Sequence, residues 1–196
     1  MSKYRSEAFD MAFENVPVIN LRLDFEQVRR YASDLNIAEA AGQNSMRVHW
    51  NNNRPEIENE LNWLMRMSII NIECYVQYAV WETLHRKGLW TPEVAQKLRK
   101  PFSLGRGTCR VFYQSLPSLI SPDVSLTRSN KKLWERTLRL YEEVRNPLFH
   151  GKQAVQLRPE AFSAVIEHLG EMYQWIDSWC LRDWLFGVPE SQSRRP

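Results

Sequence analysis

The spacing of apolar residues along most of the chain predicts helices, because apolar side chains recur every three or four residues. A first helix is predicted to begin at Asp24, a favourable N-cap, and to stop at Gly42. Phe25, Val28 and Tyr31 lie on one face of this helix. That face is therefore expected to pack against the rest of the protein.

The longest apolar segment lies in the middle of the chain. Pro55 is well placed in the first turn of a helix that runs to Lys87, with Gly88 as the stop. This helix is apolar on more than one face, so we expect it to be the central helix of the fold. A second long helix is predicted from about Pro159 to Phe186.

Shorter elements are predicted between the two long helices. Thr91 is a suitable cap for a short helix that has Pro92 in its first turn and ends at about Arg99. An amphipathic helix is predicted from about Ser129. The remaining assignments are an Asn-rich loop over 43–55, a short helix within 105–116, a linker over 121–130 and a strand-like run over 16–23.

These elements predict an all-α protein, a helical bundle of four to six helices of which two are long. The chain has 196 residues and a mass of 23.3 kDa, which suits a single domain over residues 1–196. Residues 1–23 are expected to be an N-terminal extension, and residues 187–196 a disordered tail.

Composition narrows the class of protein. The three cysteines, Cys74, Cys109 and Cys180, are odd in number and far apart, which argues against disulfides and against a structural zinc site. Each is expected to be a small buried apolar residue. No metal and no cofactor are expected, because neither ligand spacing nor a nucleotide-binding motif occurs. The charged N-terminus and the lack of a long apolar run indicate a cytoplasmic protein with no membrane partner.

Charge is distributed unevenly along the chain. Residues 97–158 contain 13 Lys and Arg but only 4 Asp and Glu, whereas the whole chain has a net charge of +3. A basic segment of this kind indicates a polyanionic partner such as RNA. The alternative is a solvated basic surface with no ligand, and charge alone does not separate the two.

The candidate chemistry lies in "EVRNPLFHG", which contains Arg145, Asn146 and His150. Pro147 should end or kink the preceding helix at Asn146, so that Arg145 lies near a helix end and His150 in the following turn. An imidazole can accept or donate a proton near neutral pH, and a guanidinium neutralises phosphate oxygens. The pair suits RNA cleavage, with His150 moving the proton and Arg145 stabilising charge at phosphorus.

This string resembles the R-N-x-x-x-H-G form of the R-x(4–6)-H signature of the HEPN superfamily, whose name abbreviates higher eukaryotes and prokaryotes nucleotide-binding. The resemblance covers about ten residues. It implies an all-α, usually dimeric, metal-independent endoribonuclease of the toxin or antiviral defence type, with Arg145 and His150 as catalytic residues and Asn146 in support. Its dimers bring two motifs into one cleft. An antitoxin or regulatory protein is a further candidate partner. In HEPN toxins with a nucleotidyltransferase antitoxin a tyrosine, the modified residue, often stands where this chain has Lys152, so neutralisation by that modification is not expected here.

The resemblance also suggests which residues hold RNA. The candidates for contacts with flanking phosphates are Lys131, Lys132, Arg136, Arg139 and Lys152. Each of these could equally belong to a solvated face, and Glu142 could simply pair with Arg145. His49 and Trp50 in the Asn-rich loop suit single-stranded RNA, although such loops are also ordinary turn material. The rival hypothesis for the whole protein is a non-catalytic module for dimerisation, RNA binding or protein interaction.

Overall fold

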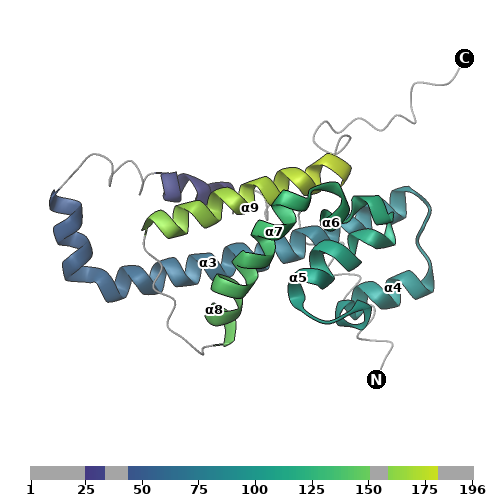
Figure 1. The fold of residues 1–196 in the computed structure, drawn as a ribbon, viewed down its shortest axis with the longest axis horizontal. Helices are drawn as coiled ribbons and strands as arrows, with labels where there is room; N and C mark the ends of the chain where they lie inside the picture. The colour runs from purple at the N-terminus through teal and green to yellow at the C-terminus, as the bar shows by residue number, and fades with distance from the viewer. Residues whose placement is uncertain (1–24, 34–43, 151–158, 181–196) are drawn as a thin grey trace, which may run out of the picture.

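The computed structural model describes residues 25–33, 44–150 and 159–180, and over these ranges the protein is all-α. The central element is α3 (Asn44–Arg86), along which α9 (Pro159–Cys180) packs in the same direction (Figure 1). The two helices are joined through polar groups as well as through the core. The Tyr75 hydroxyl donates a hydrogen bond to Asp177 at 2.7 Å, and the Tyr75 and Tyr173 rings lie 4.9 Å apart.

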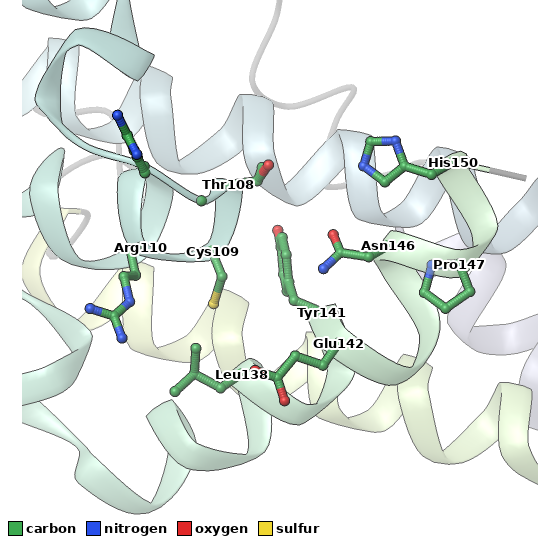
Figure 2. Close-up of a pocket in the computed structure, with 11 residues that line it drawn as sticks. Thr108, Cys109, Arg110, Leu138, Tyr141, Glu142, Asn146, Pro147 and His150 are labelled. Carbon is green, nitrogen blue, oxygen red and sulfur yellow. The ribbon is translucent and has the colours of Figure 1, made fainter. Parts of the chain in front are cut away.

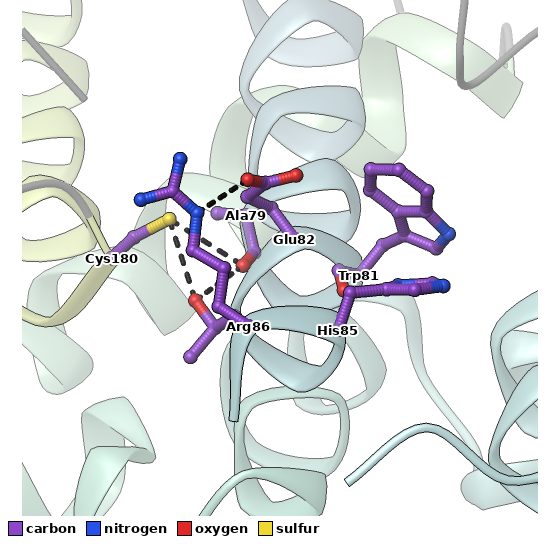
Figure 3. Close-up of polar contacts among 7 residues, drawn as sticks. Ala79, Trp81, Glu82, His85, Arg86 and Cys180 are labelled. Atoms are coloured by element: carbon purple, nitrogen blue, oxygen red, sulfur yellow. Dashed lines mark hydrogen bonds and ion pairs between the residues drawn. The ribbon is translucent and has the colours of Figure 1, made fainter. Parts of the chain in front are cut away.

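The C-terminal ends of α3 and α9 meet around a thiol (Figure 3). The Cys180 thiol donates to the carbonyl oxygen of Ala79 at 3.4 Å, and the hydroxyl of Thr83 donates to the same oxygen at 2.7 Å. Burial raises the pKa of Cys180 to about 11, so the thiol stays protonated at neutral pH. Glu82 and Arg86 form an ion pair one turn apart on the same helix.

The helix over 25–33 runs antiparallel to α9 and covers part of the core. Phe25 packs on Tyr173 with ring centroids 4.4 Å apart, and the Ser163 hydroxyl donates to the carbonyl oxygen of Ala32 at 3.2 Å. The predicted continuation to residue 41, the strand-like run over 16–23 and the two terminal segments of the predicted domain lie outside the described residues.

The Asn-rich segment corrects a prediction. Residues 44–55 are not a loop, because α3 begins at Asn44 and continues through Pro55. Asparagine costs only a few tenths of a kcal/mol in a helix interior, about 0.7 at most, and a long helix that is already nucleated can extend at that cost. Pro55 removes one backbone hydrogen bond, and α3 bends near its N-terminal end (Figure 1).

The short elements follow the predicted order and contain more helical turns than predicted. Thr91 caps α4 (Pro92–Arg99) by accepting the N–H of Val94 at 3.3 Å, as its sequence indicates. The predicted helix within 105–116 is divided into α5 (Thr108–Arg110) and a π turn, η2 (Val111–Ser115). The other short elements are η1 (Pro101–Leu104), η3 (Pro117–Leu119), η4 (Pro122–Val124) and α6 (Leu126–Ser129), the last two within the predicted linker.

One face of α3 forms the core, and the opposite face reaches solvent. Trp63, Met67, Ile70 and Cys74 are all exposed, at a spacing that places them on one side of the helix. The expectation that Cys74 is buried is therefore wrong, because no described element covers this side of α3. Cys109 is buried, as predicted, whereas Cys180 is half-buried. In the described ranges, no helix is both long and apolar enough to span a membrane.

Candidate functional site

The motif lies on a helix that changes its winding as it crosses α3 (Figure 1). It begins as α7 (Lys131–Leu140), where the Asn130 side chain accepts the N–H of Leu133 at 3.0 Å. It widens into a π turn, η5 (Tyr141–Arg145), and continues as α8 (Asn146–His150).

Pro147 does not end this helix. The predicted kink takes the form of the π turn, in which the N–H of Asn146 bonds to the carbonyl oxygen of Tyr141, five residues back. The wider turn lets the chain pass a residue that has no N–H to donate. As a result His150 lies within α8, and the expectation that it stands in a turn after the helix is wrong.

Arg145 lies on the inner face of this helix, against α3. Its Nε is 3.3 Å from Glu73 Oε1, and the two side chains are only 12% and 11% exposed. The Tyr141 hydroxyl donates to the same carboxylate oxygen at 2.8 Å. Desolvation raises the pKa of Glu73, although the hydrogen bond from Tyr141 and the charge of Arg145 oppose this rise. Arg145 thus pairs with Glu73 on α3 and not with Glu142.

Aromatic rings enclose the ion pair. The Arg145 guanidinium lies 4.4 Å from the centroid of Phe149 and 5.8 Å from that of Tyr141. The hydroxyls of Tyr113 and Tyr141 are 3.0 Å apart. Because the single proton of Tyr141 goes to Glu73, Tyr113 must donate to Tyr141. We call Tyr113, Tyr141, Glu73 and Arg145 the anchor network.

The outer face of the same helix lines a pocket of about 630 Å³ (Figure 2). The opposite wall comes from α5 and the loop before it. Figure 2 shows Thr108, Cys109 and Arg110 on one side of the pocket, and Asn146, Pro147 and His150 on the other. The complete lining is Arg106, Gly107, Thr108, Cys109, Arg110, Leu138, Tyr141, Glu142, Asn146, Pro147 and His150.

Arg145 and His150 therefore do not line one pocket within a single chain. His150 and Asn146 are exposed and line it, whereas Arg145 is outside its lining and faces Glu73. Five residues along an α-helix rotate the side chain by about 140° from the starting face, which separates the two positions. The convergence of Arg145 and His150 in one cleft is not seen in the isolated chain.

Four of the five predicted phosphate-binding residues lie on α7, and none of these four belongs to the pocket lining. Lys131, Lys132 and Arg139 are exposed. Arg136 is bound to both carboxylate oxygens of Glu171 on α9, at 3.0 and 2.7 Å, so its charge is already compensated. Lys152 lies outside the described residues.

Two cationic residues of the pocket, Arg106 and Arg110, were not singled out from the sequence. Their signal is the string "GRGTCR", which is too short to be a phosphate loop by sequence criteria. Gly107 has a φ of +86°, a left-handed conformation that glycine adopts without strain, and it lets the chain turn from η1 into α5. Glu73 was also missed, and its only signal is that it is the one carboxylate in the apolar stretch over 61–81.

Two further histidines, His168 and His85, have structural contacts. His168 is buried on α9, where its Nε2 lies 3.1 Å from the Thr137 hydroxyl and burial lowers its pKa to about 4. That hydroxyl donates to the carbonyl of Leu133, so His168 is the donor in the contact. His85 in the last turn of α3 bonds to the carbonyl oxygen of Trp81 at 2.9 Å and stacks on Trp90, with centroids 4.1 Å apart.

Comparisons with protein-family models, with curated proteins and with solved structures found no match for this chain. Within the described part of the chain, no group of three or more His, Cys, Asp or Glu side chains is placed to hold a metal ion.

Proposed function

We propose that the protein is a HEPN-type, metal-independent endoribonuclease that cleaves single-stranded RNA at the pocket between α5 and α8. The observation that carries the proposal is an exposed imidazole, His150, facing a wall that contains two arginines, Arg106 and Arg110. The pocket has a size typical of ligand sites, which span about 300–1,000 Å³.

The proposed reaction is an intramolecular transesterification. His150 removes the proton of a ribose 2′-hydroxyl, whose oxygen forms a bond to the adjacent phosphorus. The bond from phosphorus to the 5′-oxygen of the next nucleotide breaks, and that oxygen receives a proton from an imidazolium. The products are a 2′,3′-cyclic phosphate and a 5′-hydroxyl.

The two arginines of the pocket would neutralise the phosphate, because a guanidinium stays charged and matches phosphate oxygens with two parallel donors. Arg145 contributes differently from the sequence-based expectation. Through Glu73 it fixes the motif helix on α3, and this holds His150 and Asn146 at the pocket. A homodimer is part of the proposal, since a second His150 could supply the acid while the first acts as the base.

A second function is favoured by one observation, the burial of the Arg145–Glu73 pair. Under this alternative the motif is a structural helix anchor, and the basic pocket binds RNA without cleaving it.

The deciding experiment is a cleavage assay on a labelled single strand and on total RNA with EDTA present. We expect His150→Ala to reduce cleavage by a factor of roughly 10² to 10⁴, the usual contribution of a general acid or base. His85→Ala is the matched control, because His85 is also exposed but lies at the end of α3 outside the pocket lining. Binding of RNA without cleavage by the wild type would establish the alternative. Equal cleavage by wild type and His150→Ala would remove His150 from the mechanism.

A further inference from the structure

The pocket contains groups that the proposed cleavage reaction does not use, Glu142 and Asn146. They lie four residues apart across the π turn and both line the pocket. Figure 2 shows Asn146 beside the Tyr141 ring and Glu142 below it, near Leu138. Both side chains are exposed, and no hydrogen bond or ion pair joins the Glu142 carboxylate to another described residue.

An unpaired carboxylate inside a basic pocket limits which ligand can bind there. It repels a phosphate, so the phosphate must sit nearer to Arg106 and Arg110. Neither arginine forms an ion pair with a described carboxylate, in contrast to Arg136 and Arg145. The pocket thus has a cationic wall for phosphate and a separate group of acceptors and donors on η5 and α8.

The chemistry of the carboxylate points to one base. An ionised carboxylate only accepts hydrogen bonds and can accept two parallel ones. Among the RNA bases, guanine alone presents two adjacent donors, N1–H and the N2 amino group, on its Watson–Crick edge. Adenine and cytosine present a donor beside an acceptor, and uracil presents one donor between two acceptors. Asn146 can donate from its amide to O6 or N7 on the opposite edge of guanine.

The remaining lining suits the flat faces of a base. Cys109 is buried, and Leu138 and Pro147 are half-buried, so their apolar atoms present a water-poor surface at the pocket wall. Burial raises the pKa of the Cys109 thiol to about 12, so it remains a neutral contact at physiological pH.

We infer that this pocket binds a guanine nucleotide of single-stranded RNA, with Glu142 reading the Watson–Crick edge, Asn146 the opposite edge, and Arg106 and Arg110 holding the phosphate. The inference rests on the proposed function for its choice of RNA as the polymer. It adds the base preference and the residues that determine it.

The test measures binding apart from cleavage. Fluorescein-labelled oligonucleotides carry 2′-fluoro groups throughout, so they have no 2′-hydroxyl and cannot undergo the transesterification. Each is a run of uridines with one central guanine, inosine or adenine. By fluorescence anisotropy we expect guanine to bind roughly tenfold more tightly than adenine, the discrimination of a good bidentate pair. Inosine should fall between them, because it keeps N1–H and lacks the amino group.

Two variants, each with a matched control, identify the residues that select guanine and those that hold the phosphate. Glu142→Gln should remove the advantage of guanine, whereas Glu143→Gln, an exposed neighbour outside the pocket lining, should keep it. Arg110→Ala should weaken binding of all three oligonucleotides equally and reduce the salt dependence. Arg128→Ala, whose exposed side chain pairs with Asp123, should change neither.

Each outcome decides the inference. Equal affinity for guanine and adenine, no binding of any oligonucleotide, or a guanine preference that survives Glu142→Gln would overturn it. A preference that Glu142→Gln removes would establish it, even if the corresponding 2′-hydroxyl RNA is never cleaved. In that last case the ribonuclease proposal would fail while the guanine pocket would stand.

Discussion

The two faces of the motif helix differ in almost every physical property, although they come from the same ten residues. On the inner face, Arg145 and Tyr141 are committed to Glu73 in a nearly dry environment. On the outer face, Asn146 and His150 are exposed at a pocket. Groups that are already paired with one another set the position of the helix. The exposed groups remain available for a ligand.

The anchor network should be where a substitution has its largest effect on folding. Arg145→Ala leaves the Glu73 carboxylate buried without its ion-pair partner, so we expect a loss on the order of 3–5 kcal/mol in the free energy of unfolding. Urea denaturation of the wild type and the variant measures this loss. Arg136→Ala is the control, because its pair with Glu171 is 41% and 47% exposed and should contribute less than about 1 kcal/mol. Equal losses in the two variants would show that the burial of the Arg145 pair has no special weight.

For the buried residues, the comparison extends to pH through His168. The pKa of His168 falls from 6.5 to about 4 on folding, so the unfolded chain binds a proton between these values and the folded chain does not. Stability that is fully present above pH 6.5 should therefore fall as the pH drops towards 4, by an amount on the order of 3 kcal/mol.

Denaturation at pH 7 and pH 4.5 tests this dependence on His168→Gln, which removes the titrating group and keeps a polar side chain. The variant should have a shallower pH dependence than the wild type. An unchanged slope in His168→Gln would assign the acid sensitivity to other groups.

The smallest loss of stability is expected at Tyr113, which joins the anchor network through Tyr141. Tyr113→Phe removes the hydrogen bond to Tyr141 and leaves no buried donor without a partner, so it should cost about 1 kcal/mol. Tyr141→Phe should cost more, because it leaves both Tyr113 and Glu73 without that partner. The reverse order in thermal denaturation would mean that Tyr113 has a different donor role.

Local sequence signals predicted the parts of the fold that local physics determines. Thr91 and Pro92 mark the start of α4 because a cap and a helix-compatible first residue act within one turn. Residues 44–55 were assigned wrongly because the stability of a helix extension depends on the helix behind it. The π turn at Tyr141–Arg145 has no established local signal beyond Pro147, and it decides which side chains face the pocket.

The residues of the candidate site divide in the same way, into those that local sequence signals predict and those that depend on packing between distant segments. His150 and Asn146 could be chosen from the sequence, because the residue types and their spacing suggest the chemistry. Arg106 and Arg110 could not, since they reach the pocket only through the packing of a loop about 40 residues away along the chain. The partner of Arg145 was equally hidden, because Glu73 lies on another helix.

The π turn within the motif helix has a consequence for how this protein can vary. One extra residue in a turn rotates everything after it by about 100° relative to an uninterrupted α-helix. The segment before the turn, with Leu133 and Thr137 in the core, and the segment after it, with His150 at the pocket, are therefore offset from each other by this angle. Deleting one residue between positions 141 and 145 would swing His150 away from the pocket and leave α7 in place.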